Sequence, residues 1–137
     1  MTIGVLIISH ESLGQTLLDI CTKTLGLCPL TAQVIGVPLD ADPDVLINEA
    51  ETRLDTLDTG DGVLVLTDLC GATPANIACK LRHRIKQHKQ LTVVAGLNLP
   101  MLMRVLNYPD LSLDDSAERA IKGGQQGVML LSGRHER

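Results

Sequence analysis

Aromatic residues are almost absent from this sequence, which contains no Phe, no Trp and a single Tyr. Domains that bind RNA or single-stranded DNA hold bases on aromatic side chains, so such domains are not expected here. The formal charge of −4 gives no general attraction to phosphate backbones or anionic lipids. Nucleic acid and a membrane surface are therefore not expected as direct partners, and the core must be built from Leu, Val, Ile and Ala.

The four cysteines lack the paired spacing of a structural zinc site. Cys21, Cys28, Cys70 and Cys79 are separated by 7, 42 and 9 residues, and no CxxC motif occurs. Cys79 and His83 lie four positions apart on a predicted helix, but no further ligand is close to them in sequence. Neither a metal nor any other cofactor is expected, and the cysteines are interpreted as reduced thiols.

A long hydrophobic segment is also missing. The first apolar run ends at Ile8, and no basic residue precedes it. Neither a secretory signal peptide nor a membrane-spanning helix is predicted from a run of this length. We expect a cytoplasmic protein.

Four short apolar runs rich in β-branched residues are typical of buried parallel strands. They cover residues 3–8, 33–37, 62–66 and 91–95. Segments with helical spacing lie between them, and a last strand is predicted at residues 127–131. A length of 137 residues suits a single domain, residues 1–137. The pattern predicts an α/β fold with an open, doubly wound, mainly parallel sheet in the order 2-1-3-4 and helices on both faces.

Short polar residues mark the expected helix starts. Asp42 and Thr73 each stand directly before a Pro, and Ser112 precedes the last predicted helix. Gly26 and Gly60 are expected near helix ends, where glycine adopts the left-handed conformation most easily.

The carboxyl ends of the strands are where an open α/β sheet binds ligands. The first strand leads into His10 and the third into Asp68, and these two strands are neighbours in the predicted order. A carboxylate that accepts a hydrogen bond from one imidazole nitrogen leaves the other nitrogen as a nucleophile. His10 and Asp68 are therefore the candidate catalytic pair. The alternative is that His10 is structural and that Asp68 satisfies backbone amides in a turn.

The residues around this pair favour a phosphoryl group as the ligand. Helices are predicted to begin after Ser12 and at Thr73, so free amides at two helix N-termini could face an anion on His10. Gly71 and Ala72 would allow close approach of the backbone. No GxxxxGK[ST] or GxGxxG motif occurs, so no nucleotide site is predicted. Ser12, Gly71, Ala72 and Thr73 are the candidate binding residues around a phosphohistidine, although Thr73 is expected to serve first as a helix cap.

Three blocks of the sequence carry a family resemblance: GVLIISH at residues 4–10, GVLVLTD leading to GATPAN within residues 62–76, and GLNLPML at residues 96–102. In this order they resemble the mannose-family enzyme IIA domains of the bacterial phosphoenolpyruvate:sugar phosphotransferase system, over nearly the whole chain. The resemblance implies a phosphotransferase whose His10 is phosphorylated by the phosphocarrier protein HPr, with Asp68 as the partner of the histidine. Thr73 takes the place of a hydroxyl residue that is commonly Ser.

The same resemblance implies partners. It predicts transfer to an enzyme IIB in carbohydrate uptake, with a permease as an indirect link to the membrane. It also predicts a homodimer that exchanges the strand at residues 127–131. The 137 residues leave no room for a fused IIB domain, so a separate acceptor protein is expected.

The sequence departs from the family pattern beside the site. Glu11 stands where Gly often follows the histidine, and its carboxylate would repel phosphate on His10 unless it points away. Cys70 and Ala72 stand where Trp and Gly are common. These departures keep open the alternative of a stand-alone regulatory phosphoprotein of an incomplete phosphotransferase system, which acts on a target protein. A second alternative is a phosphocarrier for a dihydroxyacetone kinase, a related protein that shares the fold and the histidine after the first strand.

Overall fold

The structure, a computed structural model, describes residues 2–85 and 90–133. Within these residues, four strands form a parallel sheet in the order β2-β1-β3-β4, which confirms the predicted order. The strands are β1 (Gly4–His10), β2 (Ala32–Val37), β3 (Val63–Thr67) and β4 (Leu91–Ala95).

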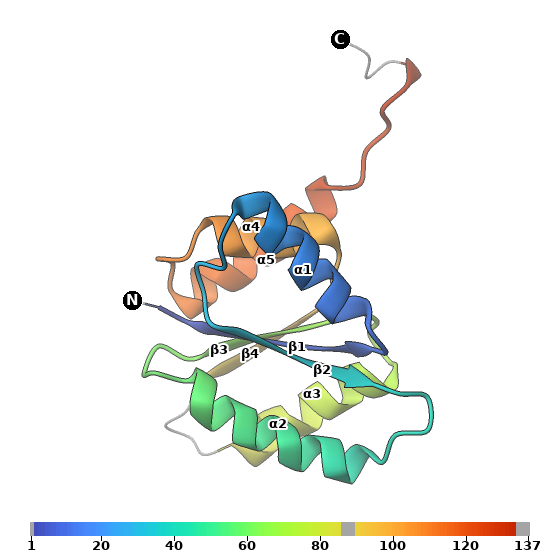
Figure 1. Cartoon of the computed structure of the whole chain (residues 1–137), viewed down its shortest axis with the longest axis vertical. Coiled ribbons are helices and arrows are strands. Elements are labelled where there is room, and N and C mark those ends of the chain that lie inside the picture. Colours follow the sequence, from blue (N-terminus) through green and yellow to red (C-terminus); the bar gives the residue numbers. More distant parts are fainter. Residues whose placement is uncertain (1, 86–89, 134–137) are drawn as a thin grey trace.

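Helices cover both faces of this sheet, as the sequence predicts for a doubly wound fold (Figure 1). The helices of the described residues are α1 (Leu13–Leu25), α2 (Pro43–Leu57), α3 (Thr73–Arg84), α4 (Leu99–Asn107) and α5 (Leu113–Gln126). Helices α1, α4 and α5 lie on one face, and α2 and α3 lie on the other.

The coverage of both faces explains the continuous apolar runs in the sequence. Side chains alternate along a strand, so a strand covered on both sides is apolar at every position. Val5 and Ile7 of β1 join the core beneath α1, α4 and α5, whereas Leu6 and Ile8 join the core beneath α2 and α3. All four side chains are fully buried.

Most of the expected helix signals are found where the sequence places them. Asp42 caps α2 by accepting a hydrogen bond from the amide of Asp44, and Ser112 caps α5 in the same way. Gly26 ends α1 in the left-handed conformation, with φ 81°. Gly60 lies beyond the end of its helix, because α2 already stops at Leu57.

The prediction that Thr73 caps α3 is wrong by one residue. Ala72 is the N-cap, with extended backbone angles (φ −88°, ψ 170°), and Thr73 is the first helical residue. The reason is the turn at Gly71, whose φ of 89° reverses the chain directly before Ala72. Alanine has no side-chain oxygen, so α3 begins without a side-chain cap.

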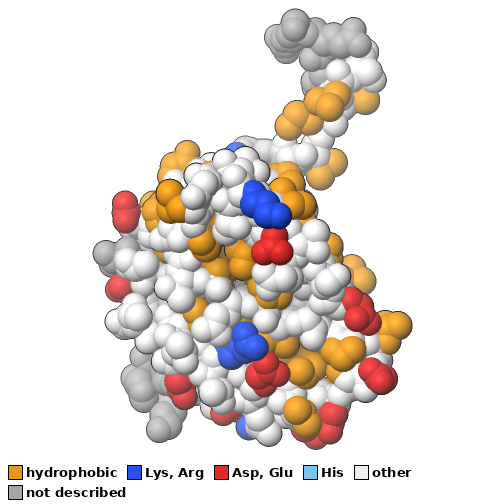
Figure 2. Space-filling view, in the orientation of Figure 1, with side chains coloured by type: hydrophobic (Ala, Val, Ile, Leu, Met, Phe, Trp, Pro, Cys, Tyr) orange, Lys and Arg blue, Asp and Glu red, His pale blue; other side chains and the backbone are white. Residues whose placement is uncertain are grey.

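The strand expected at residues 127–131 is not formed within the single chain. After α5 the segment leaves the body of the molecule (Figure 1), and its apolar side chains project with it (Figure 2). A strand exists only where its backbone finds a partner strand, and this segment finds none among the described residues of its own chain. Four large side chains remain exposed: Val128, Met129, Leu130 and Leu131.

Candidate functional site

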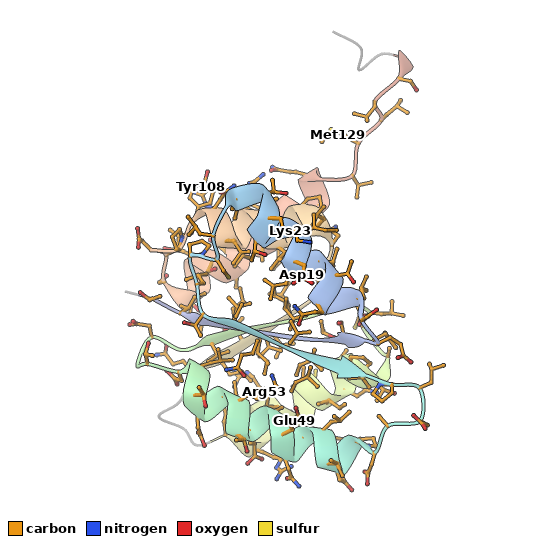
Figure 3. The ribbon with its side chains drawn as sticks, viewed as in Figure 1. Asp19, Lys23, Glu49, Arg53, Tyr108 and Met129 are labelled. Carbon is orange, nitrogen blue, oxygen red and sulfur yellow. The ribbon has the colours of Figure 1, made fainter. Side chains whose placement is uncertain are left out.

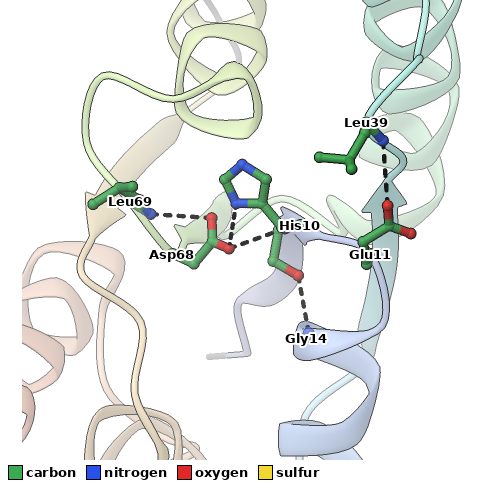
Figure 4. Close-up of polar contacts among 7 residues, drawn as sticks. His10, Glu11, Gly14, Leu39, Asp68 and Leu69 are labelled. Atoms are coloured by element: carbon green, nitrogen blue, oxygen red, sulfur yellow. Dashed lines mark hydrogen bonds and ion pairs between the residues drawn. The ribbon is translucent and has the colours of Figure 1, made fainter.

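His10 and Asp68 meet at the carboxyl edge of the sheet. His10 is the last residue of β1, and Asp68 directly follows β3, the neighbouring strand. The ring Nδ1 of His10 lies 2.8 Å from Asp68 Oδ2 (Figure 4). The structure therefore brings together the two residues that the sequence singles out as a catalytic pair.

The Asp68 carboxylate is held by more than the ring. Its Oδ2 atom also accepts a hydrogen bond from the backbone N–H of His10 (3.0 Å), and its Oδ1 atom accepts one from the backbone N–H of Leu69 (3.0 Å). The Asp68 side chain is only 9% exposed, whereas that of His10 is 36% exposed. The carboxylate is thus a fixed, sheltered group, and the ring is held at one end and open at the other.

These contacts set the charge of Asp68. Burial by itself raises the pKa of the carboxyl, but hydrogen bonds from the backbone amide and ring of His10, together with the charge of that ring, hold the pKa below its usual value. Asp68 is therefore ionised at neutral pH and accepts the Nδ1 proton of the ring. The lone pair of a neutral ring then lies on Nε2, which points away from Asp68 (Figure 4).

Ser9 positions the start of α1, a role that the sequence reasoning missed. Its side chain is fully buried, and its Oγ accepts a hydrogen bond from the backbone N–H of Gly14 (2.9 Å). A Cβ added at Gly14 would lie 2.6 Å from this oxygen, so the close approach of α1 to β1 depends on glycine. A polar Ser at the end of an otherwise apolar run was the available signal. Ser12, by contrast, makes no capping hydrogen bond with its side chain.

The carboxylate of Glu11 is directed to the loop between β2 and α2. The backbone N–H of Leu39 donates a hydrogen bond to Glu11 Oε1 (3.2 Å), as Figure 4 shows. The orientation that the sequence left open is therefore away from Asp68 and toward Leu39.

The four candidate phosphate-binding residues lie at the starts of α1 and α3, at the same edge of the sheet as His10. Within the described part of the chain, Ser12, Gly71, Ala72 and Thr73 make no hydrogen bond to His10 or Asp68. The Thr73 hydroxyl is not used as a cap and is exposed. The uncapped first turn of α3 and this hydroxyl are groups that can bond an anion.

Cys79 and His83 are both exposed on α3. In residues 2–85 and 90–133, no three His, Cys, Asp or Glu side chains gather closely enough to hold a metal ion. Over the same residues, none of the helices has the length and apolar character needed to cross a membrane.

Comparison with known proteins gives similarity over almost the whole chain. The model of the EIIA-man family, described as the PTS system fructose IIA component, matches residues 4–121. The mannose-specific EIIAB component of the phosphotransferase system of Escherichia coli (strain K12) is 32% identical over 133 residues, which cover 96% of this chain and 40% of that protein. The chain thus spans about two fifths of the length of this curated relative.

Solved structures share the fold. The mannose/sorbose specific IIA subunit from Enterococcus faecalis superposes with a TM-score of 0.82 at 26% identity, covering 96% of both chains. The phosphotransferase system component EIIA from Streptococcus agalactiae also has a TM-score of 0.82, at 23% identity, covering 94% of this chain and 97% of that one.

Proposed function

Because the chain belongs to the EIIA-man family of phosphotransferase-system IIA components, we propose that His10 accepts a phosphoryl group from the phosphocarrier HPr. The acceptor in this proposal is a separate enzyme IIB that takes part in carbohydrate uptake. The transfer takes place in the cytoplasm. Membership of the family supports a phosphotransfer role in that system, and it does not favour the regulatory or the dihydroxyacetone alternative. The observation that carries the assignment to His10 is its 2.8 Å contact with Asp68.

The proposed transfer is an in-line displacement. The Nε2 lone pair of His10 attacks the phosphorus of the carrier's phosphohistidine, a new N–P bond forms, and the carrier's N–P bond breaks with its electron pair returning to the carrier's imidazole. The His10 ring becomes positively charged while its Nδ1 proton stays directed at Asp68. The same step in the opposite sense delivers the group to the acceptor.

Backbone amides complete the proposed site. The first turn of α3 has no side-chain cap, and Gly71 turns the chain directly before it. Amide groups of this turn and the hydroxyls of Thr73 and Ser12 would stabilise the transferring oxygens, which carry most of the charge in the transition state. The side chain of Ala72 is only a methyl group, which is small enough to leave these amides open.

Reconstitution tests this function. The purified chain is incubated with phosphoenolpyruvate carrying labelled phosphate, enzyme I and HPr, and an enzyme IIB is then added. We expect label on the chain only when HPr is present, followed by discharge to the IIB protein. A chain that stays unlabelled, or that is labelled equally well without HPr, would contradict the proposal.

We further propose a homodimer in which residues 127–131 of one copy pair with β4 of the other. β4 is an edge strand, and its contact with β3 begins with the bond from Val63 N–H to Gln90 O. Because alternate residues of a parallel strand face the same neighbour, the backbone groups of Leu91, Val93 and Ala95 face outward. A cavity of about 330 Å³ lies along β4 beside α3, and a second cavity of about 210 Å³ lies at the carboxyl end of β4, beside α4 and α5.

At the other edge strand of the sheet, β2, a side chain occupies an outward-facing backbone group. By the same alternation, Val34 of β2 faces outward, since Thr31 and Val37 bond to β1. Arg53 of α2 donates a hydrogen bond to the Val34 carbonyl oxygen (3.3 Å) and forms an ion pair with Glu49. Figure 3 labels Arg53 and Glu49 on α2. A charged side chain that occupies an outward-facing backbone group of an edge strand disfavours pairing with another chain at that position. This contrast supports β4 as the edge that receives the exchanged segment, on which Met129 is labelled in Figure 3.

Truncation after Gln126 is expected to convert the dimer into aggregating protein. It would remove the exchanged segment and leave β4 of each copy as an open edge. Size-exclusion chromatography with light scattering measures the outcome, and a chain that ends at Gly133 serves as the matched control because it keeps residues 127–131. A soluble monomeric truncate that still accepts phosphate would count against the exchange.

A further inference from the structure

Glu11 has a backbone conformation that disfavours its own side chain. Its φ of 47° is the one positive value found for a residue other than glycine in the described part of the chain. Glycine adopts this conformation without steric cost, whereas any residue with a Cβ is strained there. The backbone alone would therefore favour Gly at this position, directly after His10. A strained residue beside a functional group indicates that its side chain has a role of its own.

Glu11 contacts the end of β2 and the loop that follows it through three of its groups. Its backbone N–H donates to the carbonyl oxygen of Val37 (3.0 Å), and its carboxylate accepts from the N–H of Leu39 (3.2 Å). Its carbonyl oxygen lies so close to Gly36 that a Cβ added there would be 2.3 Å away. The side-chain contact is the one that reaches the loop of residues 38–42, which we call the 38–42 loop.

The 38–42 loop presents an apolar side chain beside the site. Leu39 is 91% exposed, although a leucine gains nothing from contact with water. Leu69, next to Asp68, is 60% exposed, and Leu13, at the start of α1, is 42% exposed. All three belong to segments that begin at the carboxyl edge of the sheet, where His10 ends β1. A protein that brings a phosphohistidine within bonding distance of His10 must lie against these segments.

We propose that Glu11 is a positioning residue, whose carboxylate fixes the 38–42 loop so that Leu39 contacts the phosphorylated carrier protein. The inference rests on the proposed function of His10. The Glu11 carboxylate acts through Leu39 and not on the phosphoryl group, because its hydrogen-bonded oxygen is directed to the backbone amide of Leu39. The contact of Leu39 with the carrier sets the affinity for the carrier, whereas His10 and Asp68 carry out the chemical step.

Four variants test this proposal. Glu11→Gly removes the carboxylate and relieves the strained backbone, whereas Glu11→Gln keeps an oxygen that can accept the Leu39 amide but removes the charge. Leu39→Ser removes the apolar contact, and the Glu11→Gly/Leu39→Ser double variant completes a cycle. Leu27→Ser is the matched control. Leu27 is 60% exposed, but it follows the end of α1 and lies at the amino ends of the strands, away from His10.

The kinetic readout is the KM for phosphorylated HPr, measured separately from kcat. Glu11→Gly and Leu39→Ser should each raise KM about fivefold with kcat nearly unchanged, and the double variant should also show about fivefold, because both changes remove the same contact. Glu11→Gln and Leu27→Ser should keep the KM of the unchanged chain. An equal rise in KM for Glu11→Gln, or an effect of roughly 25-fold in the double variant, would overturn the proposal.

Amide hydrogen exchange separates this proposal from the proposed function. Exchange at the Leu39 amide requires no phosphorylation, and it should be about fivefold faster in Glu11→Gly and unchanged in Glu11→Gln. Unchanged exchange in Glu11→Gly would overturn the role of Glu11 even if His10 is phosphorylated. A chain that is not labelled at all overturns the proposed function and the carrier contact with it, whatever the exchange result.

Discussion

Replacement of His10 by Ala is expected to reduce phosphorylation of the chain by more than about 10³-fold, to the background of the assay. The variant loses the proposed nucleophile, because His10 is the histidine whose ring contacts Asp68 among the described residues. The fold should persist, because the ring is 36% exposed and Asp68 keeps its hydrogen bonds to the backbone amides of His10 and Leu69. Labelling from phosphoenolpyruvate through enzyme I and HPr measures the effect, with circular dichroism as a check of folding.

His83→Ala is the matched control for this experiment. His83 is exposed on α3 and makes no contact with the candidate site. His88 and His135 lie outside the described residues, and variants of each belong in the same assay. Label that persists on the His10→Ala chain would refute the assignment of the phosphorylated residue.

Replacement of Asp68 by Asn should slow phosphoryl uptake on the order of 100-fold, at the lower end of what a positioned proton-holding group contributes. The amide can still accept from the ring with its oxygen, but it cannot stabilise the positive charge that forms on His10. It also turns its NH₂ group toward the N–H of Leu69, where the carboxylate now accepts. This donor-to-donor contact should lower the free energy of unfolding by about 1 kcal/mol.

The same variant carries a pH signature. Because the pKa of Asp68 is held below its usual value in the folded chain by its bonds to His10, the unfolded chain takes up the proton first as the pH falls. The stability from this carboxylate is therefore present above the usual pKa of an aspartate and is lost as the pH falls through the lower folded value. Thermal unfolding should show a difference between the unchanged chain and Asp68→Asn at pH 7 that shrinks in acid. Normal transfer rates in the folded variant would leave Asp68 as a turn residue only, and a difference that does not change with pH would contradict the lowered pKa of its carboxyl.

The sheet order and the meeting of His10 with Asp68 were predictable from the sequence. The apolar runs identify buried strands, and short crossover connections leave few possible orders, of which 2-1-3-4 places β1 next to β3. Once these strands are parallel neighbours, the residues at or directly after their carboxyl ends lie close together. Both predictions depend on patterns that extend over many residues, and details of a single residue do not change them.

Features that depend on one residue were not predictable. The N-cap of α3 is Ala72 and not the predicted Thr73, because the turn at Gly71 fixes where the helix begins. The buried bond from Gly14 to Ser9 depends on a close approach of α1 to β1 that no periodicity reveals. The direction of the Glu11 carboxylate depends on a tertiary contact with Leu39.

The segment at residues 127–131 illustrates a different limit. Its apolar residues indicate a strand, but the strand needs a partner that the described chain does not supply. A sequence pattern can therefore state what a segment is suited to form without stating which copy of the chain provides the pairing edge.

The most direct test of the account is to determine which ring nitrogen of His10 carries the phosphoryl group. The chain with ¹⁵N-labelled histidine is phosphorylated through HPr, and nuclear magnetic resonance reads the coupling between phosphorus and each ring nitrogen. Because Asp68 Oδ2 lies 2.8 Å from Nδ1 and holds its proton, the phosphoryl group should be found on Nε2 with Nδ1 still protonated. A phosphoryl group on Nδ1 of His10, or on another histidine, would contradict the account.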